Sequence, residues 1–260
     1  MLRNPNVLKI AGWLVLASGA WAADSILVVD RGLPSSANLN NVSGAARSNV
    51  RWASGDSGFL GDHFMLGAPG EKWVIDSIRT WAVPGLEEVD PDHLGDFYED
   101  VRLYFGVSSR GLTPVASTLL SPGNDESSNP NVRITEASRA GATLYDNFGK
   151  FLRVWQVDFS GLNLSVDGGV NYSFGVWGMG REIPGGNGKG YMWFNHASNA
   201  PLSAARQDGA DGVMLLFDAS GRAAGEFTGQ GNGWDKSSDI NVQVFAHRLS
   251  GRQIAAQRAQ

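Results

Sequence analysis

The densest group of ionisable side chains follows an apolar stretch in the first half of the chain. It consists of Glu87, Glu88, Asp90, Asp92, His93, Asp96, Glu99 and Asp100. Carboxylates this close together can collect a hard cation, because calcium takes about six to eight oxygen ligands. We therefore predict Asp90, Asp92, Asp96 and Glu99 as candidate metal ligands, with structural calcium as the candidate cofactor.

The acidic group has two further interpretations. Glycosidases typically use two carboxyl groups in catalysis, one acting as acid and one as base or nucleophile. The segment also lacks a regular calcium-loop motif of the EF-hand kind, and an acidic loop without a cation simply stays in solvent. All three interpretations remain open at this point.

Tryptophan provides a different kind of candidate site. Seven tryptophans follow residue 22, namely Trp52, Trp73, Trp81, Trp155, Trp177, Trp193 and Trp234. Most tryptophans are buried, but an exposed indole ring can stack on the apolar face of a sugar. Trp177 alternates against the apolar residues of its strand, and Trp234 follows the glycine-rich stretch 229–233. We expect these two to be exposed and to contact a ligand.

Two polar residues, Asn195 and His196, end a predicted strand beside a loop. A histidine at a loop mouth can act as an acid, a base or a ligand, although a hydrogen-bonded structural role is the alternative. Ser57 lies in a Gly-Asp-Ser-Gly segment similar to a protease nucleophile, but no histidine precedes it. A catalytic triad is defined by geometry and not by four residues, so we expect a glycine-rich turn there.

The elements that position these residues are predicted to be short strands. The chain has 34 glycines, and turn-forming residues separate apolar runs at fairly even intervals. Strands are expected at 26–29, 49–53, 63–66, 73–83, 101–107, 115–120, 132–135, 151–159, 170–177, 190–196, 213–217 and 240–246. Only the segment 89–100 is a candidate for a short helix.

Strict alternation of apolar residues identifies the expected core. Leu103 and Phe105 alternate with Arg102 and Tyr104, which places the second pair on the opposite face. Phe174 and Val176 are buried by the same reasoning. Strands without intervening long helices argue against a parallel sheet. We therefore predict an all-β protein, an antiparallel β-sandwich of the jelly-roll kind with few short helices.

The N-terminal residues have the layout of a secretory signal peptide. Arg3 and Lys9 precede an apolar run over 10–20, and Ala20-Trp21-Ala22 resembles a cleavage site. The run is too short for a membrane span, which needs about 20 apolar residues. We predict a signal peptide over 1–22, one sandwich domain over 23–250, a polar tail over 251–260, and a secreted or periplasmic location without a membrane span.

Charge and cysteine content restrict the partners. The chain has 21 basic and 26 acidic residues, and loss of Arg3 and Lys9 takes the net charge from −5 to −7. Nucleic acid binding requires clustered basic residues, so no nucleic acid partner is expected. The absence of cysteine means that no disulfide and no thiolate zinc site can form.

Several segments resemble exported bacterial β-sandwich proteins of uncharacterised function. Asp62-His63-Phe64 followed by the segment 73–78 (WVIDSI) is similar to a D-x-F and W-x-I-D-S-I pattern in such proteins, and 155–159, 171–175 and 193–200 are similar as well. These proteins often carry a C-terminal sorting anchor with an apolar tail, whereas residues 257–260 of this sequence (QRAQ) do not form an apolar tail. The resemblance implies a fold and an exported location, and it implies no catalytic residue.

The sequence thus predicts a secreted, non-enzymatic module that binds glycan or another extracellular surface component. One alternative is a polysaccharide-active hydrolase or lyase that uses the loop carboxylates or His196. The other alternative is a structural matrix protein.

Overall fold

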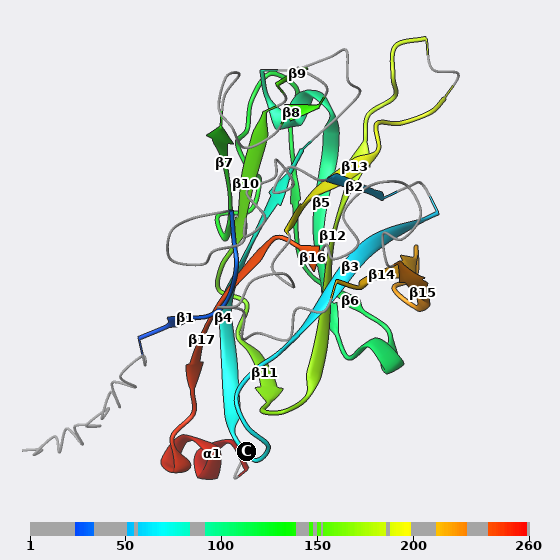
Figure 1. Ribbon diagram of the computed structural model, residues 1–260. Coiled ribbons are helices and arrows are strands. Elements are labelled where there is room, and N and C mark those ends of the chain that lie inside the picture. Colours follow the sequence, from blue (N-terminus) through cyan, green and yellow to red (C-terminus); the bar gives the residue numbers. More distant parts are fainter. Residues whose placement is uncertain are drawn as a thin grey trace, which may run out of the picture.

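The computed structural model describes residues 24–33, 51–54, 57–83, 92–138, 146–147, 150–151, 153–185, 188–198, 212–227 and 239–258. Two large antiparallel sheets pack against each other in this part of the chain (Figure 1). This arrangement confirms the predicted all-β sandwich. The segment 1–22 and the candidates Asp90 and Trp234 lie outside the described residues.

The first sheet is built around its longest strand, β4 (Lys72–Ala82). The main order is β1 (Ile26–Arg31), β17 (Val242–Arg248), β4, β10 (Val154–Phe159) and β7 (Val132–Ser138). The first part of β4 also pairs with β11 (Leu164–Asp167), and its last residue pairs with β13 (Trp193–Ser198). Strand β13 in turn pairs with β2 (Arg51–Ser54) and β16 (Asp239–Ile240).

The second sheet carries the candidate site. Its order is β15 (Ala223–Phe227), β14 (Met214–Asp218), β3 (Gly58–Met65), β12 (Asn171–Gly180), β5 (Tyr98–Gly106) and β6 (Thr113–Leu119). A separate small pair joins β8 (Asp146–Asn147) and β9 (Lys150–Phe151). The chain passes repeatedly from one sheet to the other, as in a jelly roll.

The space between the sheets is filled by alternate residues of their strands. Leu103, Phe105, Phe174 and Val176 belong to this core, and none is more than 7% exposed. The ring of Phe105 lies 5.5 Å from that of Tyr172, with the two planes nearly parallel. The alternation in the sequence therefore identified the inward face correctly, because successive residues of a strand point to opposite faces.

Helices are few in the described residues. The described part of the segment 89–100, predicted as a short helix, has one 3-10 turn at Leu94–Asp96 (η2), and another lies at Ser108–Arg110 (η3). The predicted polar tail forms a helix, α1 (Gly251–Arg258). Ser250 and Gln253 start it as a capping box, since the Ser250 amide donates to Gln253 Oε1 at 2.8 Å. Among the described helices, none has the length and apolar character needed to cross a membrane.

Candidate functional site

The most distinctive surface of the described chain lies on the outer face of the second sheet, where β5, β6 and β12 run side by side. In the strand register, Asp100 is opposite Met179 on one side and Leu119 on the other, and Arg102 is opposite Trp177. Directly opposed residues of antiparallel strands share one face of the sheet. These five side chains therefore form one patch, here named the Trp177 face.

An ion pair lies at the centre of the Trp177 face. Arg102 Nε donates to Asp100 Oδ2 at 2.6 Å, and Arg102 Nη2 contacts the same oxygen. This hydrogen bond raises the pKa of Arg102 above its ordinary value, so the guanidinium stays charged. The Asp100 side chain is only 7% exposed, whereas that of Arg102 is 39% exposed. The pair thus presents mainly guanidinium N–H groups to solvent, with the carboxylate held beneath.

Apolar side chains flank this ion pair on both sides. Leu119 is 63% exposed and Met179 is 43% exposed, and the register places both beside Asp100. Between them lies an open depression of about 580 Å³. Arg181 fixes its rim, because Nε donates to Gly95 O at 2.7 Å and Nη2 donates to Leu120 O at 2.6 Å. The depression therefore combines apolar walls with a charged floor.

Trp177 lies opposite Arg102, which lines the depression, and packs against a buried aromatic cluster. Its ring centroid lies 5.9 Å from that of Phe59 and 6.5 Å from that of Tyr104. The cluster itself consists of Phe59, Tyr104, Leu112, Leu215 and Phe217. Trp177 is only partly buried against it. This placement agrees with the expected exposure of Trp177 in part.

Two glycines let the rings of the cluster lie flat on the sheet. A Cβ at Gly175 would lie 2.5 Å from the Phe59 ring, and a Cβ at Gly61 would lie 2.7 Å from the Phe217 ring. These distances are shorter than real Cβ contacts allow. Because Gly175 and Gly61 have no side chain, the rings of Phe59 and Phe217 can pack directly against the backbone at these two positions.

The turn between β14 and β15 meets the loop before β6 beside this cluster. Leu112 N donates to Gly221 O at 2.7 Å, although β3 and β12 separate the pair β14–β15, joined at Gly221, from the pair β5–β6, joined at Leu112. Tyr104 lies on the face opposite Leu103 and Phe105, as predicted, but its side chain is only 4% exposed. Its face of the sheet is occupied by the aromatic cluster.

Three of the predicted metal ligands, Asp92, Asp96 and Glu99, lie within the described residues, and each has its own surroundings. Asp92 pairs with Arg153 at 2.8 Å, and Asp96 Oδ1 accepts the amide of Gly123 at 2.7 Å. Glu99 is exposed and borders the depression of the Trp177 face. Within the described ranges, no group of three or more metal-ligating side chains occurs. The described acidic residues that were predicted to share a cation thus have separate surroundings.

Asn195 and His196 were predicted at an open loop mouth, and the structure corrects this placement. His196 is fully buried and Asn195 is 1% exposed. His196 Nδ1 lies 2.7 Å from Asn241 Oδ1, and Trp193 Nε1 donates to Asn195 Oδ1 at 2.9 Å. The Asn241 amide nitrogen donates to the carbonyl of Arg31, so its oxygen is the acceptor and His196 Nδ1 carries the proton. Neighbouring strand residues point to opposite faces, so the two side chains are buried on different sides of β13.

The same interior region contains three charged side chains. Arg31 Nη1 lies 3.2 Å from Asp62 Oδ2 and 3.7 Å from Asp239 Oδ1, and all three side chains have no exposed surface. Asp62 Oδ2 also accepts the amide of Ile240 at 2.7 Å. This network links β1, β3 and β16, and hence the two sheets. Its burial indicates a structural role.

Fold and site together define the class: an antiparallel β-sandwich with an open face that mixes apolar, aromatic and charged side chains on one sheet. No protein-family model, curated protein or solved structure matches the chain. Asp100 was part of the acidic group identified in the sequence, whereas Arg102, Leu119 and Met179 were missed as candidates. The period-two pattern that places Arg102 opposite the core side chains was the signal that could have indicated them.

Proposed function

We propose that the protein is a non-enzymatic, exported module that binds neutral glycan on the Trp177 face. The observation that carries the proposal is the Arg102–Asp100 pair, which lies between the exposed side chains of Leu119 and Met179 and next to Trp177. A sugar ring has hydroxyl groups that donate and accept hydrogen bonds, and it has apolar C–H faces. The two kinds of side chain on this patch match those two kinds of surface.

The charges favour a neutral sugar over an acidic one. Arg102 is already paired with Asp100, and Arg181 is bonded to two backbone carbonyls. A carboxylated sugar would approach the exposed carboxylate of Glu99, which lines the depression. Like charges repel, and the whole chain has a net charge of −5. Hydroxyl groups meet no such repulsion.

Binding without turnover fits these residues better than catalysis does. A glycosidase needs one carboxylic acid and a second carboxylate on opposite sides of the scissile bond. Asp100 is held by Arg102, and His196, the other predicted catalytic candidate, is buried in a hydrogen-bonded network. Export is supported by the signal-peptide layout of 1–22.

Binding to a panel of polysaccharides tests the proposal. The chain starting at Ala23 would be titrated with xylan, mannan and β-glucan as neutral probes, and with alginate and pectate as acidic probes. We expect binding to at least one neutral polysaccharide and weaker binding to the acidic ones. Trp177→Ala and Arg102→Met should each weaken it by about tenfold or more, as for central residues of an interface.

Arg133→Met is the matched control for Arg102→Met, because Arg133 is exposed on β7 of the other sheet. It should bind like the unchanged protein. Retained thermal melts and near-ultraviolet circular dichroism would show that the variants fold. Unchanged affinity of both Trp177→Ala and Arg102→Met, or release of oligosaccharide from a probe, would overturn the proposal.

A further inference from the structure

A second depression lies on the first sheet, beside α1 at the lower end of the molecule in Figure 1. It is smaller, about 220 Å³, and its lining comes from β4, β11, the end of β17 and α1. A water molecule occupies about 30 Å³ in the liquid, so this space equals roughly seven waters. A depression of this size suits a single small ring.

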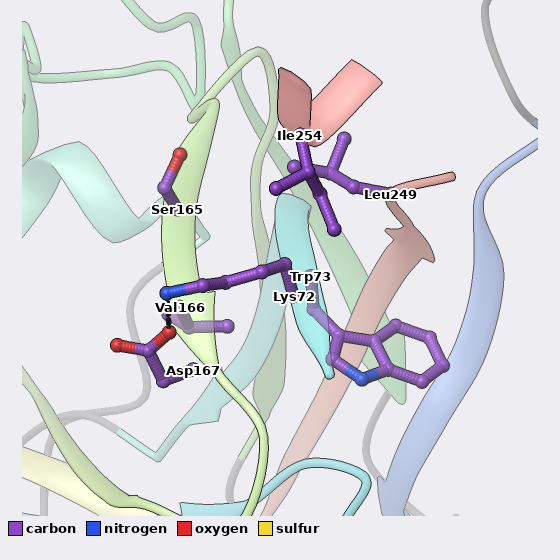
Figure 2. Close-up of a pocket in the computed structure, with 7 residues that line it drawn as sticks. All are labelled: Lys72, Trp73, Ser165, Val166, Asp167, Leu249 and Ile254. Carbon is purple, nitrogen blue, oxygen red and sulfur yellow. Dashed lines mark hydrogen bonds and ion pairs between the residues drawn. The ribbon is translucent and has the colours of Figure 1, made fainter. Parts of the chain in front are cut away.

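An ion pair also marks this second depression. Lys72 of β4 and Asp167 of β11 are directly opposite each other in the strand register. Lys72 Nζ reaches across to the Asp167 carboxylate, as Figure 2 shows. The side chains are 43% and 52% exposed, so both remain accessible. An exposed pair of this kind contributes about 0–1 kcal/mol, and a ligand can therefore replace its hydrogen bonds at little cost.

Apolar residues complete the walls. Leu249 is nearly buried and lies next to Ile254 of α1 (Figure 2), and Val166 of β11 is buried as well. The Trp73 ring extends in a different direction from Lys72, and its Nε1 donates to Glu71 Oε2 at 3.1 Å. The apolar lining consists of Trp73 and the aliphatic side chains of Val166, Leu249 and Ile254.

The two depressions share their construction but not their location. Each has one basic and one acidic side chain in contact, with apolar side chains beside them. They lie near opposite ends of β12, because Asp167 precedes Asn171 through a short turn and Met179 is near the other end. At about 3.3 Å per residue, the strand from Asn171 to Met179 covers about 26 Å. Ligands at the two sites would therefore be separate chains or distant parts of one long chain.

We propose that the Lys72–Asp167 depression is a second binding site for neutral glycan, and that the protein joins two glycan chains. This inference rests on the function proposed above for the Trp177 face. A protein with two glycan sites can hold two polysaccharide chains at once and so act as a cross-linker. Once one site is bound within a polysaccharide network, the second site meets a high effective concentration of glycan. Such an activity would combine glycan binding with a matrix role.

Calorimetry with short neutral probes tests the number of sites. The chain from Ala23 would be titrated with xylohexaose, mannohexaose and cellohexaose, and we expect two equivalents per protein for the probe that binds. The double variant Lys72→Met/Asp167→Asn should bind one equivalent, and Arg102→Met should also lose one. The matched control is Arg248→Met, which removes an exposed pair with Glu71 outside the depression.

Precipitation of the corresponding long polysaccharide gives the second readout. The unchanged protein should raise turbidity, and each single-site variant should abolish it while retaining one equivalent of binding. One equivalent in the unchanged protein, unaffected by Lys72→Met/Asp167→Asn, would overturn the second site and leave the Trp177 face intact. Absence of binding to every neutral probe and polysaccharide would overturn both proposals.

Discussion

Arg31 Nη1 lies 3.2 Å from Asp62 Oδ2, and neither side chain has any exposed surface. Arg31 belongs to the first sheet and Asp62 to the second, so this pair crosses the interior of the sandwich. Arg31 Nη2 also donates to the His63 carbonyl at 2.5 Å. A buried charge is tolerated when it is paired and hydrogen-bonded, as it is here.

Removal of one partner of this pair should be strongly destabilising. Arg31→Met leaves Asp62 and Asp239 buried without their cation, and we expect a loss of about 3–5 kcal/mol in the free energy of unfolding. Urea unfolding followed by tryptophan fluorescence measures it. The exposed Lys72→Met should cost less than about 1 kcal/mol. Similar losses in the two variants would contradict a structural role for the buried pair.

Truncation in the core gives a second prediction. Phe105 is 7% exposed, and its ring contacts those of Phe64 and Tyr172. Phe105→Ala should therefore reduce the free energy of unfolding by about 3–5 kcal/mol, because a cavity remains where the ring was. Leu119→Ala on the exposed face should change it by about 0.5 kcal/mol or less. A loss below about 1 kcal/mol for Phe105→Ala would show that the ring is not a core element.

Addition of one methyl group tests the aromatic cluster. Gly175→Ala places a Cβ 2.5 Å from the Phe59 ring and 3.2 Å from the Leu60 carbonyl. The ring must move, and overpacking of this kind costs about 1–3 kcal/mol. Gly225 provides the matched control, since a Cβ there meets nothing within 4 Å. Gly225→Ala should unfold at the same denaturant concentration as the unchanged protein or a higher one, and equal effects at the two glycines would contradict the close packing of Phe59.

The inward faces of the strands could be predicted because alternation is a local property. Val157 and Phe159 are buried on one strand as expected, and Val242 and Val244 on another. Three strands were missed, β8, β11 and β15. Their sequences, DN, LSVD and AAGEF, carry little apolar signal, and pairing with their neighbours defines them instead. Tertiary context overrides local preference in such strands.

The candidate site could be predicted less well, because its contacts come from distant parts of the chain. The acidic group looked like a cation site by spacing alone, but Asp92 meets Arg153 and Asp96 meets Gly123. The helix α1 was missed, although Ser250 and Gln253 have the capping-box spacing that could have indicated it. Of the predicted ligand contacts, Trp177 is partly exposed beside the depression, whereas His196 and Asn195 are buried.

The turn between β14 and β15 should weaken in acid, because Asp218 organises it. The Ser220 hydroxyl donates to Asp218 Oδ1 at 2.6 Å, and the amide of Arg222 donates to the same oxygen at 3.0 Å. These bonds to the charged form, the hydroxyl bond first, lower the pKa of Asp218 below its ordinary value.

The lowered pKa fixes the sign of the pH effect. The stabilisation is fully present above the ordinary aspartate pKa of about 3.9 and is lost as the pH falls through the lower folded value. At pH 7, Asp218→Asn should therefore speed hydrogen exchange of the Ser220 and Arg222 amides, and the difference should shrink as the pH falls below about 4. Glu226→Gln, an exposed acid on the same hairpin, is the matched control. Equal exchange in Asp218→Asn and the unchanged protein at pH 7 would show that the carboxylate does not hold the turn.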